Sequence, residues 1–338
     1  MKRVIALSFG LAVLIGVLMT AFVWPNSQIE PRDVPLAVAG PPEAAEQVEG
    51  RLAEAAPGAF EVEAVADEAA ARAAIEDRDV YGAIVMDPAG TPTMLTASAA
   101  SPAVARLLDG VAAQLAAAEQ PDTGPAPAVE DVVTLPDDDA RGVGFNGGAF
   151  PMVIAGTAAG AALVLTVSGV GRRLVGAASA SVLGGLSAVL VMQAWLGVLG
   201  GDWWANAGVF ALTIGAVSTT IIGLHSLIGV PGVGLGALIM VVLGNPLSGV
   251  TSAPEMLPSG WGALGQALPP GAGGTLLRST SYFDGAAAGG PLLVLTAWIA
   301  GGLLLAALGA AVSRRSVSDV PTSPAAPADP SRDPAASR

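Results

Sequence analysis

The chain has 338 residues, of which 52% are hydrophobic and only 13% are charged, and its formal net charge is −13. This composition is typical of a membrane protein, and the absence of cysteine excludes disulfides, thiolate metal sites and cysteine nucleophiles. One histidine cannot build a multi-histidine metal site, and the only lysine, Lys2, follows no glycine-rich phosphate loop. We therefore expect a non-enzymatic chain that binds no cofactor and no metal.

The first apolar segment, 4–24, follows Lys2 and Arg3 and could be either a membrane anchor or a signal peptide. Its apolar run is too long for a typical signal peptide, and the sequence TAFVWPN that ends it offers no convincing small-residue cleavage site. We favour an uncleaved anchor helix over residues 1–24.

The next block, residues 25–147, contains 22 acidic and six basic residues, whereas the rest of the chain has six acidic and nine basic residues. Alternating strand-like and helix-like patterns predict a small α/β domain here. Strands are expected at 33–40, 59–66, 80–87, 92–98 and 128–136, and helices at 42–56, 67–78 and 101–120. Asp67 and Ser101 are suitable helix starts. This block contains no serine–histidine–acid set and no paired carboxylates in a supporting context, so we do not expect hydrolysis.

The acidic run Asp137, Asp138 and Asp139 could bind cations or could form a solvated linker back to the membrane. It lacks the ligand spacing of a calcium-binding loop, which favours the linker.

Five further apolar segments approach the roughly 20 residues that a membrane-spanning helix needs. They are 151–170, 177–199, 209–228, 233–247 and 291–312, and the fourth of these is the shortest. The sequence therefore predicts an α-helical polytopic membrane protein with six transmembrane helices and an extracytoplasmic α/β domain inserted between helices 1 and 2. Residues 148–312 would form the five-helix membrane domain, and residues 313–338 a disordered tail.

The six predicted spans contain no Asp, Glu, Lys or Arg, which disfavours an ion-coupled transporter. His225 could be a proton site, but a neutral imidazole hydrogen-bonded to a neighbouring helix is the favoured interpretation. The spacing of Gly156 and Gly160 permits either a close helix contact or dimerisation.

Basic residues near the spans indicate the orientation, because such residues stay on the cytoplasmic side. The pairs at positions 2–3, 172–173 and 314–315 all fall inside if the N-terminus is inside. We therefore expect a multi-pass protein of the bacterial plasma membrane with both termini cytoplasmic and the acidic domain outside.

Residues 244–287 are rich in glycine and proline and form neither a clear span nor an ordinary loop. Asn245 and Pro246 should break the preceding helix, and a short amphipathic helix is expected at 254–268, followed by a second element at 275–281. Two interpretations remain open, an outer gate or a re-entrant plug that only packs helix ends. The candidate gate residues are Asn245, Pro246, Pro254, Pro258, Trp261 and Arg278.

This order of spans, outer domain and broken outer segment resembles the ABC-2 type transporter permeases, and most of all the phage-infection-protein (YhgE/Pip-like) membrane proteins. The resemblance is carried by DVYGAIVMDP at 79–88, GNPLSG at 244–249, APEMLP at 253–258 and LLRSTSYFDG at 276–285. It implies a homodimer or paired permease with its pore between subunits, driven by a separate cytoplasmic ATPase subunit. Only three residues precede the first span here, so coupling to an ATPase would depend on the loop at Arg172 and Arg173.

Two functions are therefore expected from the sequence. The first is a permease subunit of an ABC-2 type exporter that moves an amphiphilic or lipid-like substrate. The alternative is a non-transporting membrane-anchored envelope protein that acts as a receptor, scaffold or secretion accessory. Membrane lipids are expected partners in both cases, and nucleic acid is not.

Overall fold

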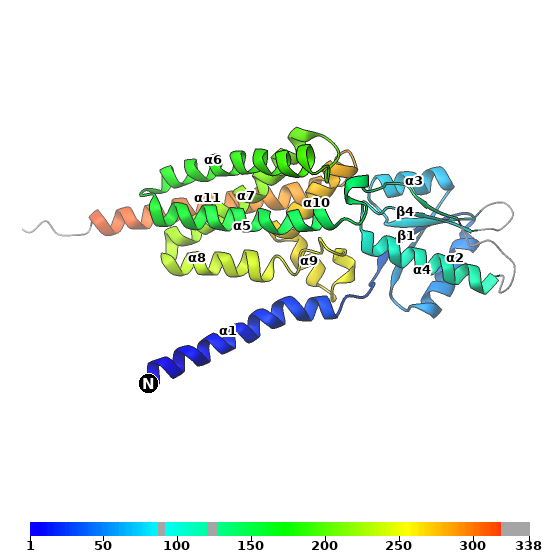
Figure 1. Ribbon diagram of the computed structural model, residues 1–338, viewed down its shortest axis with the longest axis horizontal. Coiled ribbons are helices and arrows are strands. Elements are labelled where there is room, and N and C mark those ends of the chain that lie inside the picture. The colour runs from blue at the N-terminus through cyan, green and yellow to red at the C-terminus, as the bar shows by residue number, and fades with distance from the viewer. Residues whose placement is uncertain (87–91, 120–127, 319–338) are drawn as a thin grey trace, which may run out of the picture.

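The computed structural model describes residues 1–86, 92–119 and 128–318. An α/β domain lies at one end of an elongated helical bundle (Figure 1). The N-terminus and the far end of α11 both lie at the opposite end of the bundle (Figure 1). The predicted C-terminal tail beyond residue 318, together with positions 87 and 120 at the ends of a predicted strand and helix, lies outside the described residues.

The α/β domain contains a five-stranded sheet with the order β2-β1-β3-β4-β5, in which only β3 and β4 pair antiparallel. Its strands are β1 (Val34–Ala39), β2 (Phe60–Val65), β3 (Gly82–Met86), β4 (Pro92–Thr96) and β5 (Val129–Asp131). Each lies within a strand predicted from the alternating pattern, so the small mixed sheet is confirmed.

Both faces of the sheet are covered by helices (Figure 1). The covering helices are α2 (Pro42–Ala55), α3 (Glu68–Glu76) and α4 (Pro102–Glu119). Helices α2 and α4 share a core with Leu36 and Val38 of β1, whereas α3 packs on the other face against Ala37. The predicted caps are also confirmed: Asp67 accepts the amide of Ala70 at 2.9 Å, and Ser101 accepts the amide of Val104 at 3.2 Å.

Within the described residues, five helices are long and apolar enough to cross a membrane. They are α1 (Lys2–Ser27), α5 (Val143–Thr166), α6 (Val170–Val189) with the π-helical η2 (Leu190–Trp195), α7 (Trp203–Ile228) and α11 (Gly289–Ser318). The remaining predicted span corresponds to a shorter apolar helix, α8 (Val230–Ala237) with the π-helical η3 (Leu238–Leu243). At 1.5 Å per residue this helix is about 21 Å long, less than the hydrocarbon thickness of about 30 Å. The multi-pass helical architecture is thus supported, and the count of six spans stays a prediction.

The bundle is built around α7, which is the most buried of these long helices. Glycines let its neighbours approach closely. A Cβ placed on Gly156 of α5 would lie 2.8 Å from the Cβ of Val217, and one on Gly160 would lie 3.0 Å from the Cβ of Ile221. The spacing of these two glycines therefore serves a helix contact within the chain.

The segment after η3 differs from the prediction. The single helix expected at 254–268 is wrong: the chain forms a 3₁₀ turn, η4 (Pro254–Met256), and only six residues of helix, α9 (Trp261–Gln266). Leu257 is extended because it precedes Pro258, and Gly260 adopts a left-handed φ of 80°. The predicted second element is the C-terminal half of α10 (Pro269–Tyr282), which begins earlier because prolines suit the first helical turn.

Neighbouring glycines of α11 provide a test of the packing around α7. A Cβ on Gly302 would lie 2.6 Å from the backbone carbon of Thr219, whereas one on Gly301 would meet no atom within 4 Å. We expect Gly302→Ala to lower the free energy of unfolding by about 1–3 kcal/mol through overpacking. Gly301→Ala should be neutral or stabilising by up to about 1 kcal/mol, because alanine favours a helix. Thermal unfolding of the two purified variants in detergent measures the difference in their stability. Equal unfolding midpoints would contradict the close packing of Gly302 against α7.

Candidate functional site

A cavity of about 550 Å³ lies where the α/β domain, the linker after α1 and the segment around α9 meet. We call it the junction cavity. Its polar lining residues are Arg32, Asp33, Arg78, Asp79, Tyr81, Glu255, Ser259, Gln266 and Thr275. They come from three parts of the chain, 32–33, 78–81 and 255–275, and the last lies more than 150 residues after the other two, so only the fold brings them together.

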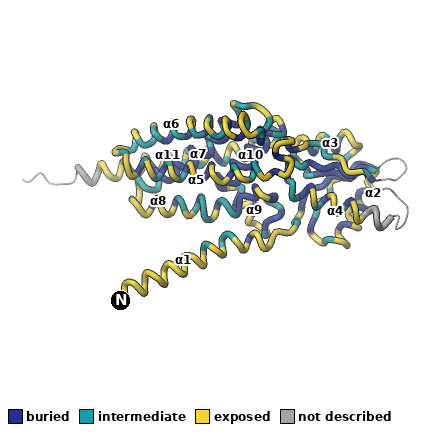
Figure 2. The backbone as a smooth tube through the Cα atoms, in the orientation of Figure 1, coloured by how far each residue is buried: buried dark blue, intermediate teal, exposed yellow. Residues whose placement is uncertain are grey.

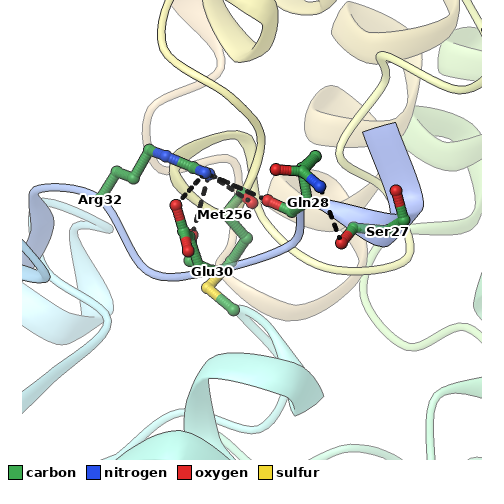
Figure 3. Close-up of polar contacts among 5 residues, drawn as sticks. All are labelled: Ser27, Gln28, Glu30, Arg32 and Met256. Carbon is green, nitrogen blue, oxygen red and sulfur yellow. Dashed lines mark hydrogen bonds and ion pairs between the residues drawn. The ribbon is translucent and has the colours of Figure 1, made fainter. Parts of the chain in front are cut away.

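One wall of the junction cavity is the linker between α1 and β1 (Figure 3). The guanidinium of Arg32 donates to the backbone carbonyls of Gln28 at 3.2 Å and of Glu30 and Met256 at 3.3 Å, and forms an ion pair with the Glu30 carboxylate. The backbone amides of Glu30 and Arg32 also donate to the carbonyls of Met256 and Glu255, at 3.2 and 3.1 Å. The linker is therefore fixed directly to η4.

A second wall is formed by Tyr81, which immediately precedes β3. Its hydroxyl donates to Oε2 of Glu255 at 2.8 Å, which joins the sheet to η4. Burial, followed by the charge of Glu255, raises the pKa of Tyr81 well above its usual range. The phenol therefore stays protonated and remains a hydrogen-bond donor at neutral pH.

Arg78 forms the third wall and lies just after α3 with a left-handed φ of 66°. Its guanidinium donates to the backbone carbonyl of Thr275 at 3.1 Å and to the hydroxyl of Ser279, both on α10. It also lies 5.2 Å from the centre of the Phe283 ring. Burial lowers the pKa of Arg78, and within the described residues it forms no ion pair with a carboxylate.

Arg278 of α10 is buried, with 6% of its surface exposed. It donates to the carbonyls of Ala99 at 2.8 Å and of Val250 at 3.1 Å, and its charge lies 4.5 Å from the centre of the Phe145 ring. Burial lowers the pKa of Arg278 to about 10, so the guanidinium is still charged at neutral pH. One side chain thus joins the α/β domain, the segment after η3 and α5.

The remaining candidate gate residues are dispersed. Pro254 and Pro258 line the junction cavity. Trp261 lies on α9 with its ring edge-to-face against Trp24 of α1, at 5.5 Å between centres. Asn245 and Pro246 lie in the turn after η3, outside the cavity lining, where the Asn245 carbonyl accepts the Ser248 hydroxyl at 2.8 Å. The structure therefore brings together two of the six gate residues at one cavity.

An apolar groove of about 460 Å³ separates the last half of α1 from the bundle. We call it the α1 groove. It is lined by Val13, Gly16, Val17, Thr20, Ala21, Trp24, Pro25, Val242, Leu243, Leu247 and Trp261. Most of α1 is exposed, and the helix diverges from the bundle toward its N-terminus (Figure 2). Trp261 of α9 faces this groove while Gly262 and Gln266 line the junction cavity, so α9 stands between the two.

Arg172 and Arg173, the residues proposed for ATPase coupling, lie in the first turn of α6 and not in a loop. Arg173 folds back onto the carbonyls of Val167 at 2.7 Å and Val164 at 3.1 Å, and its Nη1 lies 3.3 Å from Nδ1 of His225. Arg172 is exposed and donates to the hydroxyl of Ser168 at 3.0 Å. Only Arg172 of this pair therefore presents its guanidinium mainly to solvent.

The acidic run at 137–139 has a structural role that sequence reasoning missed. Asp139 is buried, and its carboxylate accepts the amides of Gly144 and Phe145 at 2.9 and 2.8 Å, at the start of α5. A carboxylate at this position stabilises the first turn of a helix. Within the described part of the chain, no group of three acidic or histidine side chains is placed to hold a metal ion.

Arg278 provides a test of how the α/β domain is attached. We expect Arg278→Met to lower the free energy of unfolding by about 2–4 kcal/mol, because two buried carbonyls lose their donor. Arg106→Met is the matched control, since Arg106 is exposed on α4 and should change stability by less than about 0.5 kcal/mol. Limited proteolysis and thermal unfolding in detergent measure both, and an equally stable Arg278→Met protein would contradict this attachment.

The geometry thus combines a polar cavity under the α/β domain with an apolar groove along α1, separated by a six-residue helix. No protein-family model, curated protein or solved structure matches this chain.

Proposed function

We propose that this chain is the permease subunit of an exporter that moves an amphiphilic or lipid-like substrate. The observation that carries the proposal is the position of the apolar α1 groove across α9 from the polar junction cavity. An amphiphile has an apolar part that is costly to expose to water and a polar part that is costly to bury without partners. A groove and a cavity on the two sides of α9 would accommodate the two parts of one molecule that passes around this short helix.

The transport path would run beside α1 or between subunits. The centre of the bundle is occupied by α7, and neighbouring helices approach it closely at glycines that include Gly156, Gly160 and Gly302. Close packing of this kind disfavours a water-filled path along α7 within one chain. A homodimer or a paired permease, as in the ABC-2 type permeases, would supply the second wall.

The proposed orientation has both termini in the cytoplasm of a bacterial cell and the α/β domain outside. It is supported by basic residues at positions 2–3, 172–173 and 314–315, since such residues remain on the cytoplasmic side. The energy would come from a separate ATPase chain, because Lys2, the only lysine, belongs to no phosphate-binding loop. Arg172, exposed in the first turn of α6, is the residue that would contact this ATPase.

A second candidate function is a non-transporting envelope protein, such as a receptor, a scaffold or a secretion accessory. It is favoured by the attachment of the α/β domain, which Arg32, Arg78 and Arg278 fix to the membrane helices or to η4. A domain held in one place could present a binding surface without any transport.

Purification of the full-length chain from its native membranes distinguishes the two functions. For the permease we expect an ATPase to co-purify, and Arg172→Glu to weaken that association at least about tenfold, because charge reversal opposes a complementary surface. Arg106→Glu, on the exposed face of α4, is the control and should leave the association unchanged. Purification without any ATPase, and no ATP hydrolysis stimulated by lipid in the reconstituted preparation, would exclude the permease and favour the envelope protein.

A further inference from the structure

The backbone around the junction cavity is strained. Within the described residues, four residues other than glycine have a left-handed φ: Asp33 at 50°, Arg78 at 66°, Asp284 at 49° and Ala287 at 53°. Three of these four, all except Asp284, line the junction cavity. Such conformations persist only where the surrounding structure enforces them, and they gather at binding sites. The cavity is therefore a place where the fold holds side chains in fixed positions.

The charges at the cavity are only partly satisfied within the protein. The Arg32 guanidinium forms an ion pair with Glu30 and donates hydrogen bonds to three backbone carbonyls. The Glu255 carboxylate accepts a hydrogen bond from the Tyr81 hydroxyl. The Arg78 guanidinium uses only Nη1 in its hydrogen bonds to α10, although a guanidinium has five donors.

Two further carboxylates complete the set. Asp33 and Asp79 form no side-chain hydrogen bond or ion pair within the described residues, and both are exposed at the cavity. Beyond the paired Arg32, the cavity therefore presents one cation and three carboxylates. A ligand that matches it carries an anionic group for Arg78 and an ammonium group for the carboxylates.

The α1 groove supplies the apolar half of the same ligand. It extends along α1 from Val13 to Pro25 and ends beside Trp24 and Trp261, next to the linker that forms a wall of the cavity. Its walls are aliphatic and aromatic, with Thr20 as the only polar lining residue. Because α1 has the length and composition of a membrane span, the groove faces hydrocarbon, and an acyl chain is the occupant that fits it.

We infer that the junction cavity and the α1 groove form one binding site for a lipid whose head carries both a phosphate and a primary ammonium. The phosphate binds Arg78, the ammonium binds Asp33 and Asp79, and one acyl chain lies along α1 between Val17 and Leu243. This inference builds on the proposed function by naming the substrate class. Binding itself requires no ATPase and no transport.

The test uses the full-length chain in detergent and three dioctanoyl probes of equal chain length: phosphatidylethanolamine, phosphatidylcholine and phosphatidylglycerol. Phosphatidylcholine has a quaternary ammonium that cannot donate a hydrogen bond, and phosphatidylglycerol has no ammonium. Calorimetric titration should give phosphatidylethanolamine an affinity about tenfold higher than either, the size expected for charge-assisted hydrogen bonds.

Variants identify the residues that select the head. Asp79→Asn should remove most of the preference for phosphatidylethanolamine over phosphatidylcholine, whereas Asp77→Asn, an exposed neighbour outside the cavity, should retain it. Arg78→Gln should weaken all three lipids about tenfold, because each carries a phosphate. If Arg78→Gln fails to fold, Asp33→Asn provides a second test, since asparagine tolerates a left-handed φ. Asp33→Asn should also reduce the preference for phosphatidylethanolamine over phosphatidylcholine.

Equal affinity for the three probes, or tighter binding of phosphatidylglycerol, would overturn the inference. Loss of preference in Asp77→Asn as large as in Asp79→Asn would also overturn it. These outcomes are separable from failure of the proposed function. Selective lipid binding without an associated ATPase would support the lipid site and exclude the permease function. An active ATPase complex without any preference among the lipid heads would support the permease function and exclude the lipid site.

Discussion

Close packing against α7 is the constraint on which the rest of the structure depends. Gly156 and Gly160 of α5 and Gly302 of α11 place neighbouring backbones against α7, where a single methyl group would lie within about 3 Å of its atoms. This packing fixes α5 and α11, and α10 packs against α7 through Gly273, whose Cβ would lie 2.5 Å from the Thr213 hydroxyl. The position of α10 then determines where the α/β domain can attach.

That attachment includes three arginines that donate to backbone carbonyls across the junction. Arg278 reaches from α10 to the α/β domain, Arg78 reaches from the α/β domain to α10, and Arg32 holds the linker to η4. A carbonyl acceptor lies in a fixed direction, so each contact specifies geometry as well as charge. The junction cavity lies between these contacts, and its shape follows from them.

The secondary structure of the α/β domain could be predicted from the sequence because alternation, helix caps and turns are local signals. The cavity could not, since Tyr81 meets Glu255 across 174 residues and Arg32 meets Met256 across 224. Arg278 could be selected as the only basic residue of its segment, but its burial under the α/β domain has no local signature. Two signals in the sequence pointed to the residues of the cavity. Tyr81 lies within one of the segments that carry the ABC-2 resemblance, and Arg32 and Arg78 are two of only six basic residues in an acidic block. The helix expected at 254–268 was wrong because Pro258 and Gly260 outweigh the apolar periodicity around them.

The α/β domain and the segment around α9 thus line a polar cavity, and an apolar groove lies on the other side of α9, along α1. We propose that the cavity and the groove bind one amphiphile together. The most direct measurement is a density map of the full-length chain in nanodiscs that contain phosphatidylethanolamine. We expect continuous density from the space between Arg78 and Asp79, past α9, to the groove between Val17 and Leu243. An empty junction cavity, or α1 packed against η3 with the groove closed, would contradict it.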